Sequence, residues 1–244
     1  MKALLLAAGL GTRLQPFTLH HPKALAIVNG KSLLQRNIEY LQAHGIRDVI
    51  VNVHHFADQI VATIETNNGW GSTITISDET EAVLETGGGL QKAAWYFDNE
   101  ESFVVMNVDM LTNMPLVKMI HQHQTNKPLA TLAITDRISS RYFLFNTFNQ
   151  LCGWRNTVTQ EEKGAVLGYE IILKQTLQQK AFSGIHLISN KIFNRIQQHG
   201  KFSLVDVYMS LCSDNVIEGY DHSESLLIDV GKPENILKAE GLFE

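Results

Sequence analysis

The stretch AAGLGTRLQPFTLHHPK, residues 7–23, decides the fold of this chain. It follows a continuous apolar run over residues 3–7, which is typical of a strand covered on both faces. Two glycines at the end of such a strand let backbone N–H groups turn inward and approach a ligand closely. Arg13 adds a forked donor that matches phosphate, and Lys23 adds a compact positive charge. The stretch therefore predicts a phosphate-binding loop after the first strand.

Two better-known glycine loops do not fit these residues. A dinucleotide fingerprint requires a third glycine at the position of Leu14 and opens a helix directly, which Pro16 disfavours. A P-loop requires Gly-Lys followed by Ser or Thr after the second glycine, and that sequence is absent here. A nicotinamide oxidoreductase is therefore disfavoured.

Outward from this loop, the first half of the chain alternates strand and helix patterns. Strands are expected at residues 48–53, 73–77, 102–108 and 129–135, and helices at 32–44, 57–66, 88–97 and 115–125. This alternation predicts an α/β fold with a doubly wound, parallel sheet. Ligands bind outside the carboxyl ends of such strands, which selects the segments after Ala7, Ser77 and Val108.

The second half is richer in strands. Strands are expected at residues 142–148, 166–173, 182–188 and 225–230, with a hairpin turn at Asn149-Gln150. Helices are expected at residues 190–198 and 204–212, and a terminal helix after Gly231-Lys232-Pro233. No linker or repeat divides the chain, so we expect one domain over residues 1–244, with halves 1–135 and 136–244.

Composition excludes several classes of protein. The chain has 244 residues, 44% hydrophobic content and a formal net charge of -5, which fit one substantial core without a broad basic surface for nucleic acid. Apolar runs are too short for a signal peptide or a membrane span. The two cysteines, far apart in sequence, are typical of thiols in a reducing cytoplasm. We expect a soluble, cytoplasmic protein without nucleic-acid or membrane partners.

Two aspartates are candidate cation ligands. Asp109 follows an apolar strand, and Asp229 ends another one before a glycine. An aspartate in this position can hold a hard cation through oxygen, although it can also cap the next element. The ten histidines are scattered and show no metal-ligand spacing.

At this point the sequence resembles a known family, the nucleoside-diphosphate-sugar pyrophosphorylases, or sugar-phosphate nucleotidyltransferases. The signature of that family, Gly-x-Gly-Thr-Arg-x-x-Pro-x-Thr…Pro-Lys, matches the loop. The resemblance continues through LETGGG at 84–89, NVD at 107–109, FSGI at 182–185 and IDVGKPE at 228–234. LETGGG and the short length are most similar to N-acetylmuramate-1-phosphate uridylyltransferases, with mannose-1-phosphate guanylyltransferases as near relatives.

The resemblance implies a fold and a set of roles. The fold is a Rossmann-like doubly wound mixed sheet of the nucleotide-diphospho-sugar transferase type, with a β-rich sugar-binding second half. The catalytic residues implied are Arg13, Lys23 and Asp109. The nucleotide-binding residues implied are Ala8, Gly9, Gly11, Thr12, Arg13, Glu81, Thr86 and Gly87. Those implied for the sugar phosphate are Lys23, Asn107, Arg155, Ser183 and Gly184, and Asp109 and Asp229 would hold Mg²⁺.

The implied reaction joins a nucleoside triphosphate to a sugar 1-phosphate. An anionic phosphate oxygen attacks the α-phosphorus in line, so positioning and charge neutralisation carry the catalysis. The choice between UTP and GTP, and between N-acetylmuramate and mannose 1-phosphate, stays open, as does monomer or homodimer. Arg155 stands where the family has a lysine and can equally be a surface residue. A catalytically silent regulatory subunit of the same fold is the alternative, which the presence of the full charged set disfavours.

Overall fold

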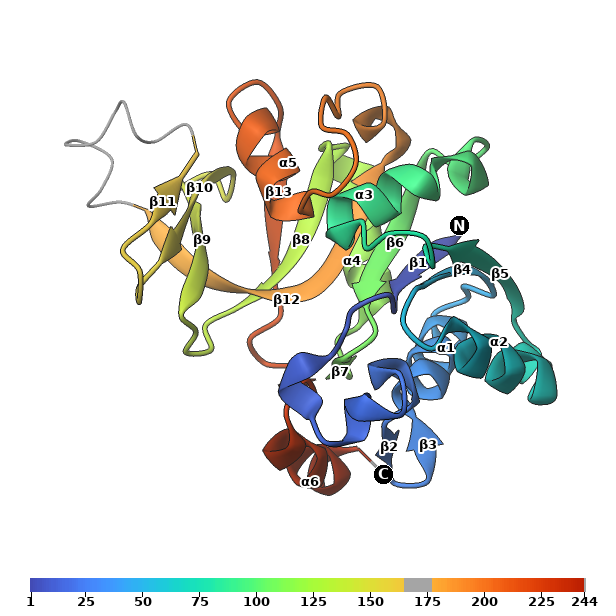
Figure 1. The fold of residues 1–244 in the computed structure, drawn as a ribbon. Coiled ribbons are helices and arrows are strands. Elements are labelled where there is room, and N and C mark those ends of the chain that lie inside the picture. Colours follow the sequence, from blue (N-terminus) through green and yellow to red (C-terminus); the bar gives the residue numbers. More distant parts are fainter. Residues whose placement is uncertain (165–176, 244) are drawn as a thin grey trace.

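The computed structural model describes residues 1–164 and 177–243. Ten strands within these residues form one sheet: β1 (Ala3–Leu6), β4 (Asp48–Val53), β5 (Thr73–Asp78), β6 (Ser102–Asn107), β8 (Ala130–Thr135), β9 (Arg141–Phe145), β10 (Leu151–Asn156), β11 (Glu162–Lys163), β12 (Gln178–Ser189) and β13 (Ile217–Asp221). Their order is β11-β10-β9-β12-β6-β1-β4-β5, with β8 between β12 and β13 (Figure 1).

The parallel centre of the sheet fixes where the strands end. β1 pairs in parallel with both β4 and β6, so that Ala3 lies opposite Val49 on one side and Val104 on the other. β4 in turn pairs in parallel with β5. The carboxyl ends of these strands therefore meet at one edge of the sheet, which is the place where such sheets bind ligands.

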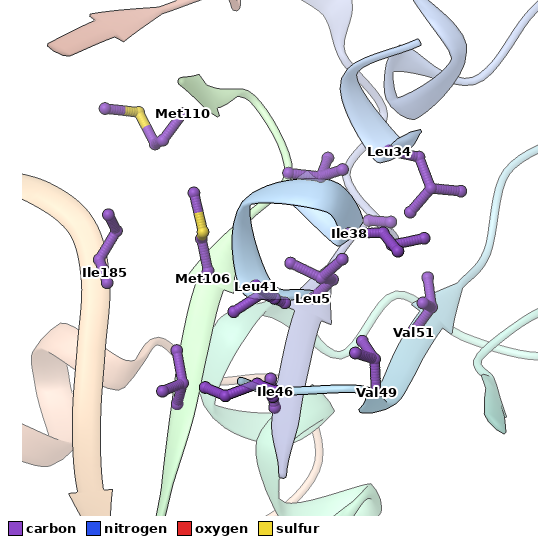
Figure 2. Packing of buried hydrophobic residues seen from close by; sticks show 14 of the residues in the cluster. Leu5, Leu34, Ile38, Leu41, Ile46, Val49, Val51, Met106, Met110 and Ile185 are labelled. Carbon is purple, nitrogen blue, oxygen red and sulfur yellow. The ribbon is translucent and has the colours of Figure 1, made fainter. Parts of the chain in front are cut away.

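Helices cover both faces of this centre. The helices α1 (Leu33–Ala43), α2 (Ala57–Thr66) and α4 (Leu116–Asn126) contribute to one buried cluster, and α3 (Glu85–Lys92) and α5 (Leu204–Leu211) contribute to another. Successive strand residues point to opposite faces, so Leu5 lies in the first cluster, shown with Ile38 and Leu41 in Figure 2, while Leu4 lies in the second. None of the described helices is long and apolar enough to cross a bilayer.

One long strand joins the two halves of the sheet. β12 pairs antiparallel with β9 through its first residues and with β6 and β8 further along. In Figure 1 it runs from the β9–β11 hairpins to the parallel centre. The sheet is therefore mixed, and the α/β fold class expected from the sequence is confirmed.

A third, smaller cluster holds the phosphate-loop region in place. It combines Leu14 of the loop with Ile228 of β14 (Leu227–Asp229) and Ala239 of α6 (Pro233–Leu242). β14 pairs antiparallel with β7 (Met110–Thr112), directly after the turn at the end of β6. The hairpin of β2 (Ile27–Val28) and β3 (Lys31–Ser32) also packs here, and Figure 1 shows α6 beside these N-terminal segments. The end of the chain thus supports its beginning.

The structure corrects two of the expected helices. The helix expected at residues 190–198 is wrong: a short 3-10 helix covers Asn190–Ile192, and hydrogen-bonded turns follow it as far as Ile196. The chain then reaches α3, where the Phe202 carbonyl accepts from two backbone N–H groups. The helix expected at residues 88–97 begins earlier, as α3, and ends in a separate 3-10 helix at Ala94–Phe97. The strand expected at residues 166–173 lies outside the described residues.

Candidate active site

The glycine loop leaves β1 and turns sharply at Gly11, whose φ of 62° lies in the left-handed region. The Thr18 hydroxyl donates to the Gly11 carbonyl oxygen over 2.9 Å and holds this turn. A Cβ on Gly11 would lie 2.9 Å from Cγ2 of Thr18 and 3.0 Å from Cβ of Lys23, so glycine is required for both conformation and space.

A cavity of about 520 Å³ lies beside this loop, and we call it the first cavity. It lies at the carboxyl edge of the parallel strands, where the fold predicts a ligand site. The sequence-predicted residues that line it are Ala8, Gly9, Gly11, Thr12, Lys23, Thr86, Asn107 and Asp109. The structure therefore brings most of the predicted nucleotide-binding residues to one place.

A buried ion pair forms one wall of the first cavity. Lys23 Nζ lies 2.7 Å from Asp109 Oδ2, and both side chains are largely shielded from solvent. Lys23 comes from the 3-10 helix Lys23–Leu25, whereas Asp109 follows β6. A charge-assisted hydrogen bond in a partly desolvated site is short and strong, so it holds the two side chains in a well-defined geometry.

A second ion pair lies on the other side of the loop. Arg13 Nη1 is 3.6 Å from Asp229 Oδ2, and the backbone N–H of Gly231 donates to Asp229 Oδ1 over 2.7 Å. A Cβ on Gly231 would lie 2.7 Å from both Arg13 Nη2 and Asp229 Oδ1. Glycine at this position therefore makes room for the pair.

The two aspartates come from neighbouring backbone segments. Asp229 pairs with Met110 in the β7–β14 ladder, and the Val230 N–H donates to the Asp109 carbonyl oxygen over 2.8 Å. Asp109 lines the first cavity, and Asp229 lines a second one. The two aspartates therefore lie at neighbouring positions of the backbone beside the glycine loop.

Two polar residues that the sequence did not single out support the floor of the first cavity. The side-chain oxygen of Asn52 accepts from the N–H groups of Ala7 and Ala8 over 2.6 and 3.2 Å. The Asn52 amide then donates to Glu79 Oε1 over 2.8 Å. Glu79 is buried, and this burial raises the pKa of its carboxyl group. Gly89 allows the contact, because its Cβ would lie 2.7 Å from Glu79 Oε1.

Three of the nucleotide-binding candidates do not line the first cavity, and one of them, Arg13, lines the second. Glu81 is exposed, and Glu79, two residues earlier, lines the first cavity instead. Gly87 was expected before a helix but lies inside the first turn of α3, where its N–H donates to the Phe202 carbonyl oxygen over 2.9 Å. This contact brings Lys201 and Ser203 to the wall of the first cavity.

The second cavity has a volume of about 890 Å³. Arg13, Asp229 and Lys232 line it on the side of the glycine loop. The β-rich half contributes its other wall, which includes Arg137, Arg141, Tyr142, Trp154 and Phe182. The two cavities share the glycine loop as a border, since Arg13 lines the second and Thr12 the first.

The remaining sugar-phosphate candidates do not line either cavity. The Arg155 Nε donates to Glu162 Oε1 over 2.6 Å, and Trp154 next to it faces the second cavity. Ser183 is fully buried and shares a hydrogen bond of 2.7 Å with His222 Nε2. A Cβ on Gly184 would lie 2.9 Å from Asn107 Nδ2, so this glycine gives room to a residue that does line the first cavity.

The residues present fit a magnesium ion that the substrates help to hold. In residues 1–164 and 177–243, no cluster of three or more His, Cys, Asp or Glu side chains could hold a metal alone. Asp109 and Asp229 nevertheless supply carboxylate oxygens from adjacent backbone segments beside the phosphate loop. Mg²⁺ usually takes one or two carboxylates and completes its shell with substrate phosphates and water.

Comparison with known proteins identifies the family. A family described as nucleotidyl transferase matches residues 2–145, more than half of the chain, and the chain therefore belongs to this family. Members of the family generally use divalent metal ions.

Two curated relatives illustrate the range of substrates in the family. An N-acetylmuramate alpha-1-phosphate uridylyltransferase from Caulobacter vibrioides is 31% identical over 98% of this chain and 95% of its own length. The catalytic subunit beta of a Dictyostelium discoideum mannose-1-phosphate guanylyltransferase is 26% identical, and this chain spans 64% of its length.

Solved structures show the same fold. HddC from Yersinia pseudotuberculosis, complexed with GMP-PN, has a TM-score of 0.76 at 23% identity, covering 100% of this chain and 99% of its own. An inositol-1-phosphate CTP transferase from T. maritima has a TM-score of 0.76 at 14% identity, covering 98% and 94% of the two chains. The resemblance and the fold inferred from the sequence are both confirmed.

Proposed function

We propose that this chain transfers a nucleotidyl group from a nucleoside triphosphate to a sugar 1-phosphate and releases pyrophosphate. The observation that carries the proposal is the arrangement of two ion pairs, Lys23–Asp109 and Arg13–Asp229, on the two sides of one glycine loop. Each pair borders a cavity, of about 520 and 890 Å³, that is large enough for one substrate. Two polyanions can therefore meet at a border where Lys23 and Arg13 supply cationic donors and Asp109 and Asp229 can hold a cation.

Residues of this chain position the triphosphate and the sugar 1-phosphate for the reaction. The backbone of the loop from Gly9 to Thr12 binds the triphosphate, and Arg13 stabilises the charge that grows on the leaving pyrophosphate. Lys23 and Asn107 orient the incoming phosphate. A phosphate oxygen of the sugar 1-phosphate forms a bond to the α-phosphorus as the bond to the β-phosphate oxygen breaks. The attacking oxygen is already anionic, so a general base is not required.

Mg²⁺ would be held by Asp109 and Asp229. When bound, it would neutralise negative charge on the reacting phosphates. The ion pairs with Lys23 and Arg13 orient the two carboxylates for this role.

The nucleoside would occupy the part of the first cavity between Ala8 and Thr86. Glu79 and Glu85, rather than Glu81, are carboxylates that line this cavity. We favour UTP over GTP as the donor, because the uridylyltransferase relative matches this chain over nearly the full length of both proteins. N-acetylmuramate and mannose 1-phosphates are the acceptors that the names of the relatives suggest.

Pyrophosphate release tests this proposal. UTP, GTP, CTP and ATP are each combined with N-acetylmuramate, mannose and glucose 1-phosphate, with and without Mg²⁺. We expect release with one donor and one class of acceptor, and none when either substrate or the cation is left out. A protein that binds a nucleotide but releases no pyrophosphate in any combination would be the silent regulatory subunit instead.

A further inference from the structure

The second cavity carries more positive charge than a neutral sugar 1-phosphate requires. Five cationic side chains line it: Arg13, Arg137, Arg141, Lys232 and Lys238. In the part of the chain that the structure describes, Asp229 is the single carboxylate among its lining residues. A cavity with this excess of positive charge favours a ligand with several negative charges.

The cations differ in whether a partner already neutralises them. Arg13 pairs with Asp229 at 3.6 Å, and Lys232 lies 4.0 Å from Glu234. Arg137 and Arg141 have no carboxylate within ion-pairing distance among residues 1–164 and 177–243. These two arginines are therefore available to a ligand.

Arg137 is fixed in position by the sheet. Its Nη2 donates to the Phe182 carbonyl oxygen over 2.7 Å, which anchors one end of the guanidinium to β12. The other N–H groups of the planar fork remain for a second acceptor. An arginine that is already held loses little rotamer freedom when it binds an anion.

The loop that carries Arg141 is held by its own hydrogen bonds. The Ser139 N–H donates to the Tyr142 hydroxyl over 2.8 Å, and the Arg141 N–H donates to the Ser139 hydroxyl over 3.2 Å. The Ser140 carbonyl oxygen accepts from the Thr157 N–H over 2.9 Å. The two arginines are thus presented by a segment that the strands on both sides restrain.

The same cavity offers a surface for a sugar ring. Tyr142, Trp154 and Phe182 line it, and aromatic faces pack well against the C–H face of a pyranose. The glycine-loop side, with Lys232, suits the phosphate of the sugar 1-phosphate. Arg137 and Arg141, contributed by the β8–β9 segment, then face another part of the sugar.

We propose that the acceptor sugar 1-phosphate carries a carboxylate in addition to its phosphate, and that Arg137 and Arg141 bind this carboxylate. The inference rests on the proposed function and narrows its acceptor class. The forked arginine donors match a carboxylate bidentately. Arg137 and Arg141 are then the residues that select an acidic sugar over a neutral one.

Two acceptors that differ in one acidic group test this inference. N-acetylmuramate 1-phosphate and N-acetylglucosamine 1-phosphate differ only in a lactyl ether that carries the carboxylate. We expect the wild-type protein to show a kcat/KM at least tenfold higher for the acidic acceptor. Arg137→Gln and Arg141→Gln should each lower kcat/KM for the acidic acceptor by about tenfold to a hundredfold, and change that for the neutral acceptor by less than about threefold.

Arg47→Gln is the matched control, because Arg47 is exposed and donates only to the Gly71 carbonyl oxygen in the described structure. Equal wild-type activity on both acceptors would overturn the inference while leaving the proposed function intact, and so would variants that lose both acceptors in the same proportion. Faster transfer to glucose 1,6-bisphosphate than to the acidic sugar would show that the arginines bind a second phosphate instead. Absence of transfer to every acceptor would refute the proposed function itself. If one arginine variant fails to fold, the other variant and the wild-type ratio of kcat/KM for the acidic and neutral acceptors still test the inference.

Discussion

Val230 donates its backbone N–H to the carbonyl oxygen of Asp109 over 2.8 Å, and this bond joins the C-terminal part of the chain to the end of β6. It places Asp229 next to Asp109 in the backbone, while their side chains border two different cavities. The glycine loop lies between these cavities, with Thr12 on one side and Arg13 on the other. A reaction between two phosphate groups would therefore require the phosphates to meet beside Asp109 and Asp229, whose backbone segments adjoin.

Asp109→Asn should abolish most of the divalent-dependent turnover. The substitution keeps the size of the side chain but removes the charge that faces Lys23 at 2.7 Å and the carboxylate that would hold the cation. We expect a fall in kcat of about a hundredfold or more, comparable to the loss of one preorganised electrostatic group. Steady-state pyrophosphate release measures it, with the exposed Asp98→Asn as control and circular dichroism as a check on folding. Wild-type rates in Asp109→Asn would show that the cation is held elsewhere.

Gly231→Ala tests the geometry of the second ion pair without changing any charge. The added Cβ would lie 2.7 Å from Arg13 Nη2 and from Asp229 Oδ1, so it must displace one of them. We expect turnover to fall by about tenfold, and Arg13→Ala to lower it by about a hundredfold. Gly241→Ala is the control, because its Cβ would meet nothing within 4 Å. Full activity in a folded Gly231→Ala protein would argue against a role for the Arg13–Asp229 pair.

Asn52→Ala should weaken both the fold and nucleotide binding. It removes the acceptor of the Ala7 and Ala8 N–H groups and the donor to Glu79 in a buried site. Unpartnered buried polar groups cost about 1–3 kcal/mol each, so we expect the free energy of unfolding in urea to fall by about 2–4 kcal/mol. The KM for the nucleoside triphosphate should rise, because the strand end that presents Ala8 loses its support. Asn67→Ala, an exposed helix-end residue, should change neither quantity appreciably; equal stability of the two variants would contradict the role given to Asn52.

We expect the protein to lose stability in mild acid, because three of its histidines are buried. Burial lowers the pKa of His186 to about 3 and those of His123 and His222 to about 4. The unfolded chain binds protons to these residues below about pH 6.5, whereas the folded protein does not, so stability rises with pH across this window and levels off above about pH 7.

Urea unfolding at pH 7.5 and pH 5.0 measures this effect. For the fully buried His186 alone, the free energy of unfolding should be lower at pH 5.0 by about 2 kcal/mol. The control is His186→Gln, for which the difference between the two pH values should shrink. The same free energy at both pH values in the wild-type protein would show that these histidines are protonated in the folded state.

The local sequence was enough to predict those helices and strands whose hydrophobic pattern fits only one kind of element. β4 and α2 have the expected bounds, because an apolar run and an amphipathic period each fit a single kind of element. The position of the glycine loop was predicted for the same reason, since Gly11, Arg13 and Lys23 lie close to one another in the chain. The helix expected at residues 190–198 is replaced by a 3-10 helix and hydrogen-bonded turns up to Ile196, and the chain just beyond it contacts α3 through Phe202.

The residues that the sequence could not single out act through contacts that are distant along the chain. Asn52 lies in β4 and Glu79 directly follows β5, and only packing shows which carboxylate of residues 78–81 is buried. Lys201 reaches the first cavity because Phe202 binds to the first turn of α3. Arg137 and Arg141 look like surface cations in the sequence, and they gain a role only when the β-rich half faces the glycine loop.

The most direct test is a crystal structure with both substrates, in which an α,β-methylene nucleoside triphosphate prevents reaction while Mg²⁺ and the sugar 1-phosphate are present. We expect the nucleotide in the first cavity and the sugar in the second, with a sugar-phosphate oxygen in line with the α-phosphorus and one cation contacted by both Asp109 and Asp229. If the two phosphates lie on opposite sides of the loop and out of reach of each other, or if the aspartates hold no common cation, direct transfer at this site is contradicted.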